Sequence, residues 1–320
     1  VMTISLLPAA AYADEPNKPT TLMVNGENII NAEGNTVVCG NGKAVYDSVS
    51  NTLTLENATI DNEYVNGSIY SNGDLTINLI GANTITLTGN TSYGIYLPIG
   101  RSLTITSSDG SGQLSVGGRI LIFGDTTISN CTLTVTSNEV NDRLLDVENG
   151  NLNIINSTVV VKSLFAEDLS DFNPYYAIFA YGEINISDNS NVDVECTKLG
   201  MHAEESMRIS NSKVKAACSG EYVVYYGIDS TDTILIEGNS DVLGIGGIDA
   251  KNGMTISPAS GSMLDIKVGI MENGETGATR FEDSPYSSQI TFDADAMSSL
   301  FGGKTYAHIS EHTHVCLLYT

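Results

Sequence analysis

The feature that most constrains this chain is a short phrase that returns several times at a nearly constant internal spacing. In each copy a small residue, an aliphatic residue and a residue expected to face outward precede a turn and a second run of alternating aliphatic residues. The first copy is Ser68-Ile69-Tyr70 before Leu75-Thr76-Ile77. Further copies begin with Gly94-Ile95-Tyr96, Ala177-Ile178-Phe179, Gly200-Met201-His202, Gly227-Ile228-Asp229 and Gly247-Ile248-Asp249. In the first and the last four copies the second run starts six residues after the aliphatic residue, which indicates a repeat architecture.

The repeat has the length and turn chemistry of stacked β coils. The second runs start at residues 75, 103, 126, 152, 184, 207, 234 and 254, about 26 residues apart. Asparagine follows several runs by two residues, at Asn57, Asn130, Asn156 and Asn211. We expect these asparagines to adopt the left-handed backbone of a tight turn and to bond to the equivalent amide one coil away.

No helical period of apolar residues is sustained anywhere, so the pattern predicts an all-β fold. Short strands joined by asparagine turns favour a single-stranded, right-handed parallel β-helix, a solenoid whose coils stack about 4.8 Å apart. A β-sandwich does not need the constant offset. A β-propeller needs more strands and about 40 residues per blade.

The chain divides into five predicted parts. Val1 to Ala13 has the apolar residues and the A-x-A ending of a signal peptide that lacks its charged start, which predicts export. Asn-Gly pairs at 25–26 and 41–42 predict tight turns in a small β element. The predicted parts are a signal-peptide remnant (1–13), a linker and N-terminal β cap (14–50), the β-helix (51–270), a C-terminal cap (271–310) with a short helix at 293–300 and a strand at 304–309, and a truncated tail (311–320).

Charge narrows the classes of partner. The chain has 14 lysines and arginines against 38 acids, a net charge of −24, which excludes nucleic acid because phosphate binding needs clustered cations. Anionic polymers would need a bridging metal such as calcium, and we expect no other cofactor. No run approaches the roughly 18 apolar residues of a membrane span. The five cysteines lack a CxxC pair, and we interpret Cys131, Cys196 and Cys218 as buried small apolar residues.

The repeated phrases also carry a resemblance. The runs Asn51 to Ile60 and Gly67 to Ile77 resemble those of secreted β-helix proteins from anaerobic Gram-positive gut bacteria, which are often labelled carbohydrate-binding or uncharacterised. The likeness covers about residues 22–270 and rests on repeated phrases rather than on catalytic residues. It implies a β-helix fold, an extracellular location and sugar binding at the cell surface.

The candidate ligand site is the residue that follows the aliphatic position of each copy. Along the chain this residue is Tyr70, Tyr96, Leu121, Asp146, Phe179, His202, Asp229 and Asp249. With small residues beside it, the stripe predicts a shallow groove where exposed rings pack on sugars and carboxylates accept hydroxyl hydrogen bonds. The alternative is that the stacked rings only stabilise a parallel sheet.

Other segments offer weaker candidates. A long insertion at 163–176 combines aromatic and acidic residues: Phe165, Phe172, Tyr175, Glu167, Asp168 and Asp171. Because long loops of solenoids often bind ligands, Phe172 and Tyr175 are also predicted ligand-binding residues. The alternative is that this loop only covers the core. His308, His312, His314 and Cys316 have zinc-ligand spacing but lie on a tail, which favours a solvated tail. Ser108 to Gly112 reads as a plain turn rather than a calcium loop.

An enzyme is the main functional alternative. Many β-helix proteins degrade polysaccharides. A retaining glycosidase needs two carboxylates about 5 Å apart, a separation that Asp229 and Asp249 on adjacent coils would have. A uronic-acid lyase needs clustered cations, whereas Arg143 and Arg208 are isolated in the sequence. The sequence therefore predicts a non-catalytic, exported, monomeric surface protein that binds glycans, with a glycosidase or a structural spacer as alternatives.

Overall fold

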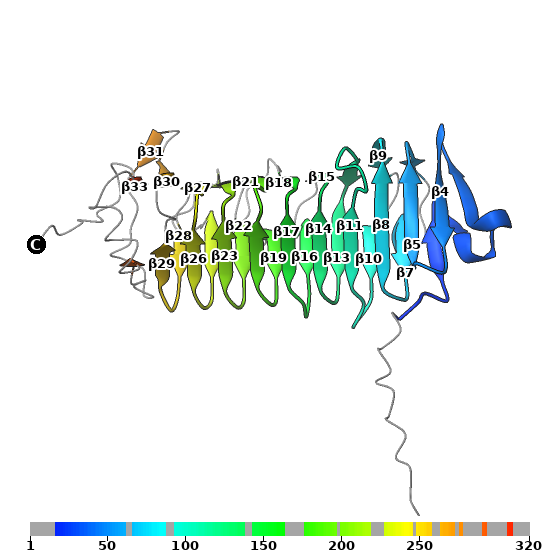
Figure 1. The fold of residues 1–320 in the computed structure, drawn as a ribbon, viewed down its shortest axis with the longest axis horizontal. Coiled ribbons are helices and arrows are strands. Elements are labelled where there is room, and N and C mark those ends of the chain that lie inside the picture. The colour runs from blue at the N-terminus through cyan, green and yellow to red at the C-terminus, as the bar shows by residue number, and fades with distance from the viewer. Residues whose placement is uncertain are drawn as a thin grey trace, which may run out of the picture.

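The computed structural model describes residues 17–61, 66–87, 93–137, 143–163, 176–196, 199–218, 227–245, 248–257, 263–272, 275–277, 290–292 and 306–309. These residues form an all-β fold built from three long sheets, here named A, B and C, and contain no α-helix. Figure 1 shows strands lying side by side along the long axis of the molecule.

Sheet A has ten strands. Their order is β2 (Glu27–Asn28), β1 (Leu22–Val24), β7 (Ile69–Ser71), β10 (Tyr93–Leu97), β13 (Arg119–Ile122), β16 (Leu145–Val147), β19 (Tyr176–Ala180), β22 (Leu199–Ala203), β25 (Ile228–Ser230) and β28 (Ile248–Ala250).

Sheet B has twelve strands. Their order is β3 (Thr36–Cys39), β4 (Gly42–Asp47), β5 (Thr52–Glu56), β8 (Leu75–Ile80), β11 (Leu103–Thr106), β14 (Thr126–Ser129), β17 (Leu152–Ile155), β20 (Ile184–Ser187), β23 (Met207–Ser210), β26 (Ile234–Glu237), β29 (Met254–Ser257) and β32 (Ile290–Phe292).

Sheet C has eleven strands: β33 (Tyr306–Ile309), which pairs with β30, and ten strands that lie in one row. Their order is β31 (Glu275–Gly277), β30 (Met263–Glu272), β27 (Asp241–Ile245), β24 (Lys213–Cys218), β21 (Asn191–Cys196), β18 (Thr158–Ser163), β15 (Thr132–Ser137), β12 (Gln113–Gly117), β9 (Ala82–Ile85) and β6 (Thr59–Ile60).

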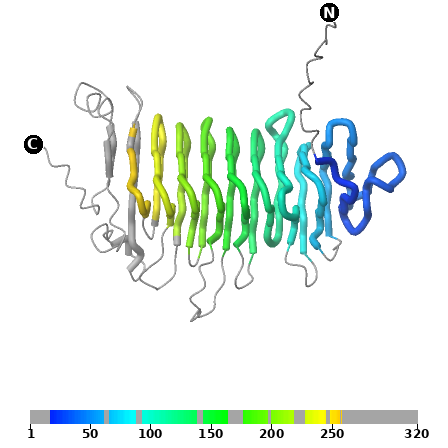
Figure 2. The backbone as a smooth tube through the Cα atoms, turned by 90° about the horizontal axis from the view of Figure 1, so that it is seen from below, coloured from blue at the N-terminus to red at the C-terminus, as the bar shows by residue number. Residues whose placement is uncertain are grey.

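From β7 to β30 the chain visits sheets A, B and C in turn, and strands that neighbour one another within this part of a sheet pair in parallel. The tube in Figure 2 follows these successive turns from one end to the other. The arrangement is compatible with a β-solenoid.

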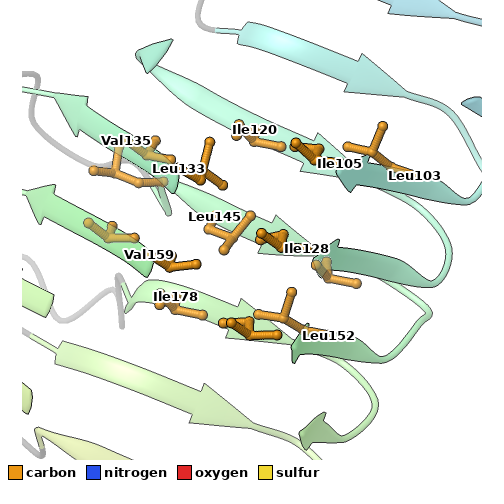
Figure 3. Close-up of a cluster of buried hydrophobic side chains, with 14 of the residues drawn as sticks. Leu103, Ile105, Ile120, Ile128, Leu133, Val135, Leu145, Leu152, Val159 and Ile178 are labelled. Carbon is orange, nitrogen blue, oxygen red and sulfur yellow. The ribbon is translucent and has the colours of Figure 1, made fainter. Parts of the chain in front are cut away.

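Aliphatic ladders fill the space between the sheets. On sheet B the inward positions of neighbouring strands are Cα partners, so that Ile105, Ile128 and Ile154 stack directly. These side chains are fully buried, and Figure 3 shows Ile105 and Ile128 in one cluster with Ile120 and Leu133 from the other two sheets. Because each fully buried aliphatic side chain contributes about 1.5–3 kcal/mol, the repeated inward position is the main stabilising feature of the fold.

Asparagine residues form the tight turns between the strands of sheet B and those of sheet C. Asn57, Asn130, Asn156 and Asn211 have φ values of 46–53°, in the left-handed region that the sequence predicted. The Asn156 side chain donates to Asn130 Oδ1 over 2.8 Å, which confirms the predicted amide bond between coils there.

Antiparallel hairpins precede the parallel part. β1 and β2 pair across Asn25 and Gly26, both of which have positive φ, as the Asn-Gly signal predicted. The turn between β3 and β4 is one residue earlier than predicted, since Gly42 already belongs to β4. Two short 3₁₀ segments, η1 (Ile29–Asn31) and η2 (Glu33–Asn35), connect the hairpins.

Near the C-terminus, β33 confirms the predicted last strand. The predicted helix at 293–300 and the tail at 311–320 lie outside the described residues. Cys131 and Cys196 are buried as predicted, and burial raises the pKa of the Cys131 thiol to about 11.

Candidate functional site

The stripe predicted from the repeat forms one row on the outer side of sheet A. Its residues are Cα partners from strand to strand, in the order Tyr70, Tyr96, Leu121, Asp146, Phe179, His202, Asp229 and Asp249. The sequence therefore placed these residues together correctly.

Burial differs from the prediction in the middle of the row. Phe179 and His202 are 3% and 6% exposed, and Asp249 is 7% exposed, so the prediction of exposed rings is wrong for Phe179 and His202. Tyr70, Tyr96 and Asp229 are half-buried. For Phe179 and His202 the cause is a second set of large side chains, Arg143 and Tyr176, that packs over these two rings.

The predicted groove of small residues is also wrong. Gly94 and Gly200 are buried at the corner between sheets C and A. A Cβ at Gly200 would lie 2.1 Å from the Gly227 carbonyl oxygen, and one at Gly94 would lie 2.3 Å from Val116 Cγ1. Small residues occur here because neighbouring backbone and core side chains leave no room for larger ones.

Three tyrosines form the tyrosine cluster, Tyr70, Tyr93 and Tyr96, at the N-terminal end of the row. The rings of Tyr70 and Tyr96 are stacked with centroids 5.8 Å apart, and those of Tyr93 and Tyr96 are 5.3 Å apart. Phe123 meets Tyr96 edge-on at 6.3 Å. Burial raises the pKa of the Tyr96 phenol. The cluster is a surface of aromatic rings packed against one another that keeps partial access to solvent.

An arginine cluster occupies the middle of the row. The Asp146 carboxylate is fully buried and pairs with Arg119, and Arg143 Nη1 lies 3.7 Å from its other oxygen. Arg143 also bonds to Glu148 at 2.9 Å and lies 3.7 Å from the centre of the Phe179 ring. Burial raises the pKa of Asp146 against the opposing effect of the two guanidinium groups. The interpretation of Arg143 as isolated is therefore wrong, because folding brings Arg119 beside it.

A histidine cluster follows, made of Tyr176, His202, Asp229 and Glu204. His202 Nδ1 lies 2.7 Å from Asp229 Oδ2, and the Tyr176 hydroxyl donates to the same oxygen over 3.2 Å. The Tyr176 ring stacks on His202 at 4.4 Å. Burial, followed by the charge of Asp229, raises the pKa of Tyr176, which keeps its phenol protonated. Glu204 Oε1 lies 3.5 Å from His202 Nε2.

The two carboxylates of the glycosidase alternative lie on neighbouring strands. Asp229 and Asp249 are Cα partners in the pair β25–β28. One oxygen of Asp229 is already engaged by Tyr176 and His202, and Asp249 is buried. Asp229 is thus held in place by neighbours from two preceding strands of sheet A.

Several predicted residues cannot be placed. Phe172 and Tyr175, with the rest of the insertion between Leu164 and Tyr175, lie outside the described residues, as do His312, His314 and Cys316. In the turn at Ser108 to Gly112, Asp109 Oδ1 accepts bonds from the Ser111 N–H and from the hydroxyls of Ser107 and Ser111. These bonds lower the pKa of Asp109 and close the turn on itself, in agreement with the plain-turn interpretation.

Sequence reasoning missed Tyr93, Arg119 and Tyr176, the side chains that cover the row. Each is the first residue of its strand. In β10 the register shifts between Tyr93 and Ile95, and both Gly94 and Ile95 are buried, so the usual alternation fails and Tyr93 joins Tyr96 on one face. A large polar or aromatic residue beside the small one, as in Tyr93-Gly94 and Tyr176-Ala177, is the signal that was available.

No family model, curated protein or solved structure matches this chain. In the part of the chain that the structure describes, no helix has the length and apolar character needed to cross a membrane.

Proposed function

We propose that this chain is a single right-handed parallel β-helix that is exported to the cell surface and binds glycans there without catalysis. Regular passage through three parallel sheets supports the solenoid, and crossovers between parallel strands are almost always right-handed. The signal-like Val1 to Ala13 and the resemblance to secreted β-helix proteins support export.

The observation that carries glycan binding is the tyrosine cluster. Its rings are fixed against one another and half-buried, so a ligand would not have to immobilise flexible side chains. Phenol edges offer apolar contact and hydroxyl groups offer hydrogen bonds, which is the combination that sugars require. The buried Phe179, His202 and Asp249 then support the face rather than contact the ligand.

Charge selects among glycans. With a net charge of −24, the protein repels anionic polysaccharides unless calcium bridges the two. Neutral glycans are therefore the expected ligands, with Phe172 and Tyr175 as further proposed contacts.

A glycan array probed with and without calcium tests the proposal. A Tyr70→Ala, Tyr96→Ala double variant should weaken binding by about tenfold or more, since each lost stacking contact costs about 0.5–1.5 kcal/mol. Tyr181→Ala is the matched control, because Tyr181 is 54% exposed and follows β19 outside the cluster. A uniform signal across all glycans that is unchanged in the double variant would show that the binding is not specific. This result would contradict the glycan-binding proposal and favour a structural spacer.

A glycosidase is the second candidate, favoured by the adjacent positions of Asp229 and Asp249 and by the bonds that orient Asp229. It predicts release of reducing sugar from a neutral polysaccharide, abolished in Asp229→Asn. Absence of release from the substrates that the array identifies would leave the non-catalytic proposal as the better account.

A further inference from the structure

A polar hollow of about 670 Å³ lies at the corner between sheets B and C, and none of its lining residues belongs to the row on sheet A. Three successive coils form it, at the starts of β21, β24 and β27. Four amide side chains from these coils line it: Asn189, Asn191, Asn211 and Asn239. We name it the asparagine hollow. Its volume lies within the usual range of small-molecule sites.

The floor of the hollow is built by serines that turn inward. The Ser190, Ser212 and Ser240 hydroxyls donate to backbone carbonyl oxygens of Ser187, Ser210 and Glu237 over 2.5, 2.8 and 2.7 Å. All three serines are buried. Their small side chains leave the depression. At the rim, Asn211 Oδ1 accepts from the Asn239 N–H over 3.0 Å and Asn211 Nδ2 donates to Ser210 Oγ over 3.3 Å. The amides of Asn189, Asn191 and Asn239 are therefore the rim groups that we assign to a ligand.

The charges in the hollow are already paired. Lys213 Nζ lies 3.4 Å from Asp241 Oδ2, and Lys215 Nζ lies 3.2 Å from Asp193 Oδ1. An anion would have to displace these carboxylates in a strongly acidic protein, and a cation would meet the two lysines. The hollow therefore favours an uncharged ligand.

We propose that the asparagine hollow binds a neutral oligosaccharide laid along the coils. An amide both donates and accepts hydrogen bonds, as does a sugar hydroxyl, and the lining has no large apolar side chain that would favour an apolar ligand. Three coils span about 10 Å at the strand spacing, the length of about two sugar rings. The inference shares the saccharide class with the proposed function but assigns a separate site.

Isothermal titration with maltotriose, cellotriose, tri-N-acetylchitotriose and trigalacturonate tests the proposal. Asn191 and Asn239 are exposed and neither has a left-handed φ, so Asn191→Ala with Asn239→Ala removes two amides without straining a turn. We expect at least one neutral trisaccharide to bind, and the double variant to weaken it about tenfold, since a hydrogen bond contributes about 0.5–1.5 kcal/mol.

The matched control is Asn153→Ala with Asn185→Ala, two amides on the outer face of sheet B that bond to each other at 3.4 Å. An equal loss in this control overturns the assignment. So does stronger binding of trigalacturonate than of every neutral sugar. If binding is abolished by Tyr70→Ala with Tyr96→Ala but not by Asn191→Ala with Asn239→Ala, the proposed site in the asparagine hollow is wrong and the sheet A proposal stands. If the unmodified chain binds none of the four probes, the proposal for the asparagine hollow is overturned, and the glycan array decides the sheet A proposal separately.

Discussion

Asp146 shows how much a single outward residue can depart from a solvated surface. It occupies the same position of the repeat as Tyr96 and Phe179, yet its carboxylate is fully buried between two arginines. Arg119 comes from the neighbouring strand β13 and Arg143 from just before β16. Removing one member of such a group is costly because the remaining charges stay desolvated and unpaired.

We predict that Asp146→Asn destabilises the protein by about 3 kcal/mol, because it leaves the largely buried Arg119 guanidinium without its counter-charge, whereas Arg143 keeps Glu148. Urea unfolding followed by circular dichroism measures this loss. Glu237→Gln is the control, since its partner Arg208 is largely exposed and a surface pair contributes about 0–1 kcal/mol. Similar losses in both variants would show that the buried group is no stronger than a surface ion pair.

At the scale of the strand, the sequence predicts which residues face the core but not which side chains cover the outer face. The inward ladder could be predicted because alternation fixes the face of each residue, as in Leu152 and Ile154. The row from Tyr70 to Asp249 could be predicted because the offset fixes its register. The burial of residues in this row could not be predicted, because Arg119 and Tyr176 contact the row from the ends of strands, where the alternation of inward and outward residues fails. The asparagine hollow could not be predicted either, because it is lined by residues from three separate coils.

Tight corners make specific glycines necessary. Gly200→Ala should destabilise the protein by about 1–3 kcal/mol, because its Cβ would lie 2.1 Å from a backbone oxygen of Gly227 that cannot rotate away. Gly117→Ala is the matched control, since its nearest neighbour would be 3.5 Å away and its φ is not positive. Thermal unfolding of both variants tests the corner, and an unchanged midpoint in Gly200→Ala would contradict it.

At the scale of the whole molecule, the ends of the stack matter most. Hairpins β1–β2 and β3–β4 pair with β7 and β5 at the N-terminal end of sheets A and B. Without them, the strands β7 and β5 would present unpaired backbone groups to other molecules.

We therefore expect deletion of residues 17–50 to cause self-association, and we expect the full chain to be a monomer. Size-exclusion chromatography with light scattering at several concentrations measures the change. Val38→Lys is the control: Val38 is 72% exposed on β3, so a charge there should keep the chain monomeric. A monodisperse deletion variant with an unchanged melting temperature would show that the hairpins do not protect the sheet edges.

The parallel pairing between successive coils also has a mechanical consequence. Hydrogen bonds between neighbouring strands run along the stacking axis, so tension applied between the two ends of the stack loads the bonds of one terminal coil before those of the next. A coil of about 26 residues that detaches releases up to about 90 Å of chain. A molecule held at one end and pulled at the other would lengthen in steps, one coil at a time. The coils that remain stacked would keep their folded structure and the same exposed residues.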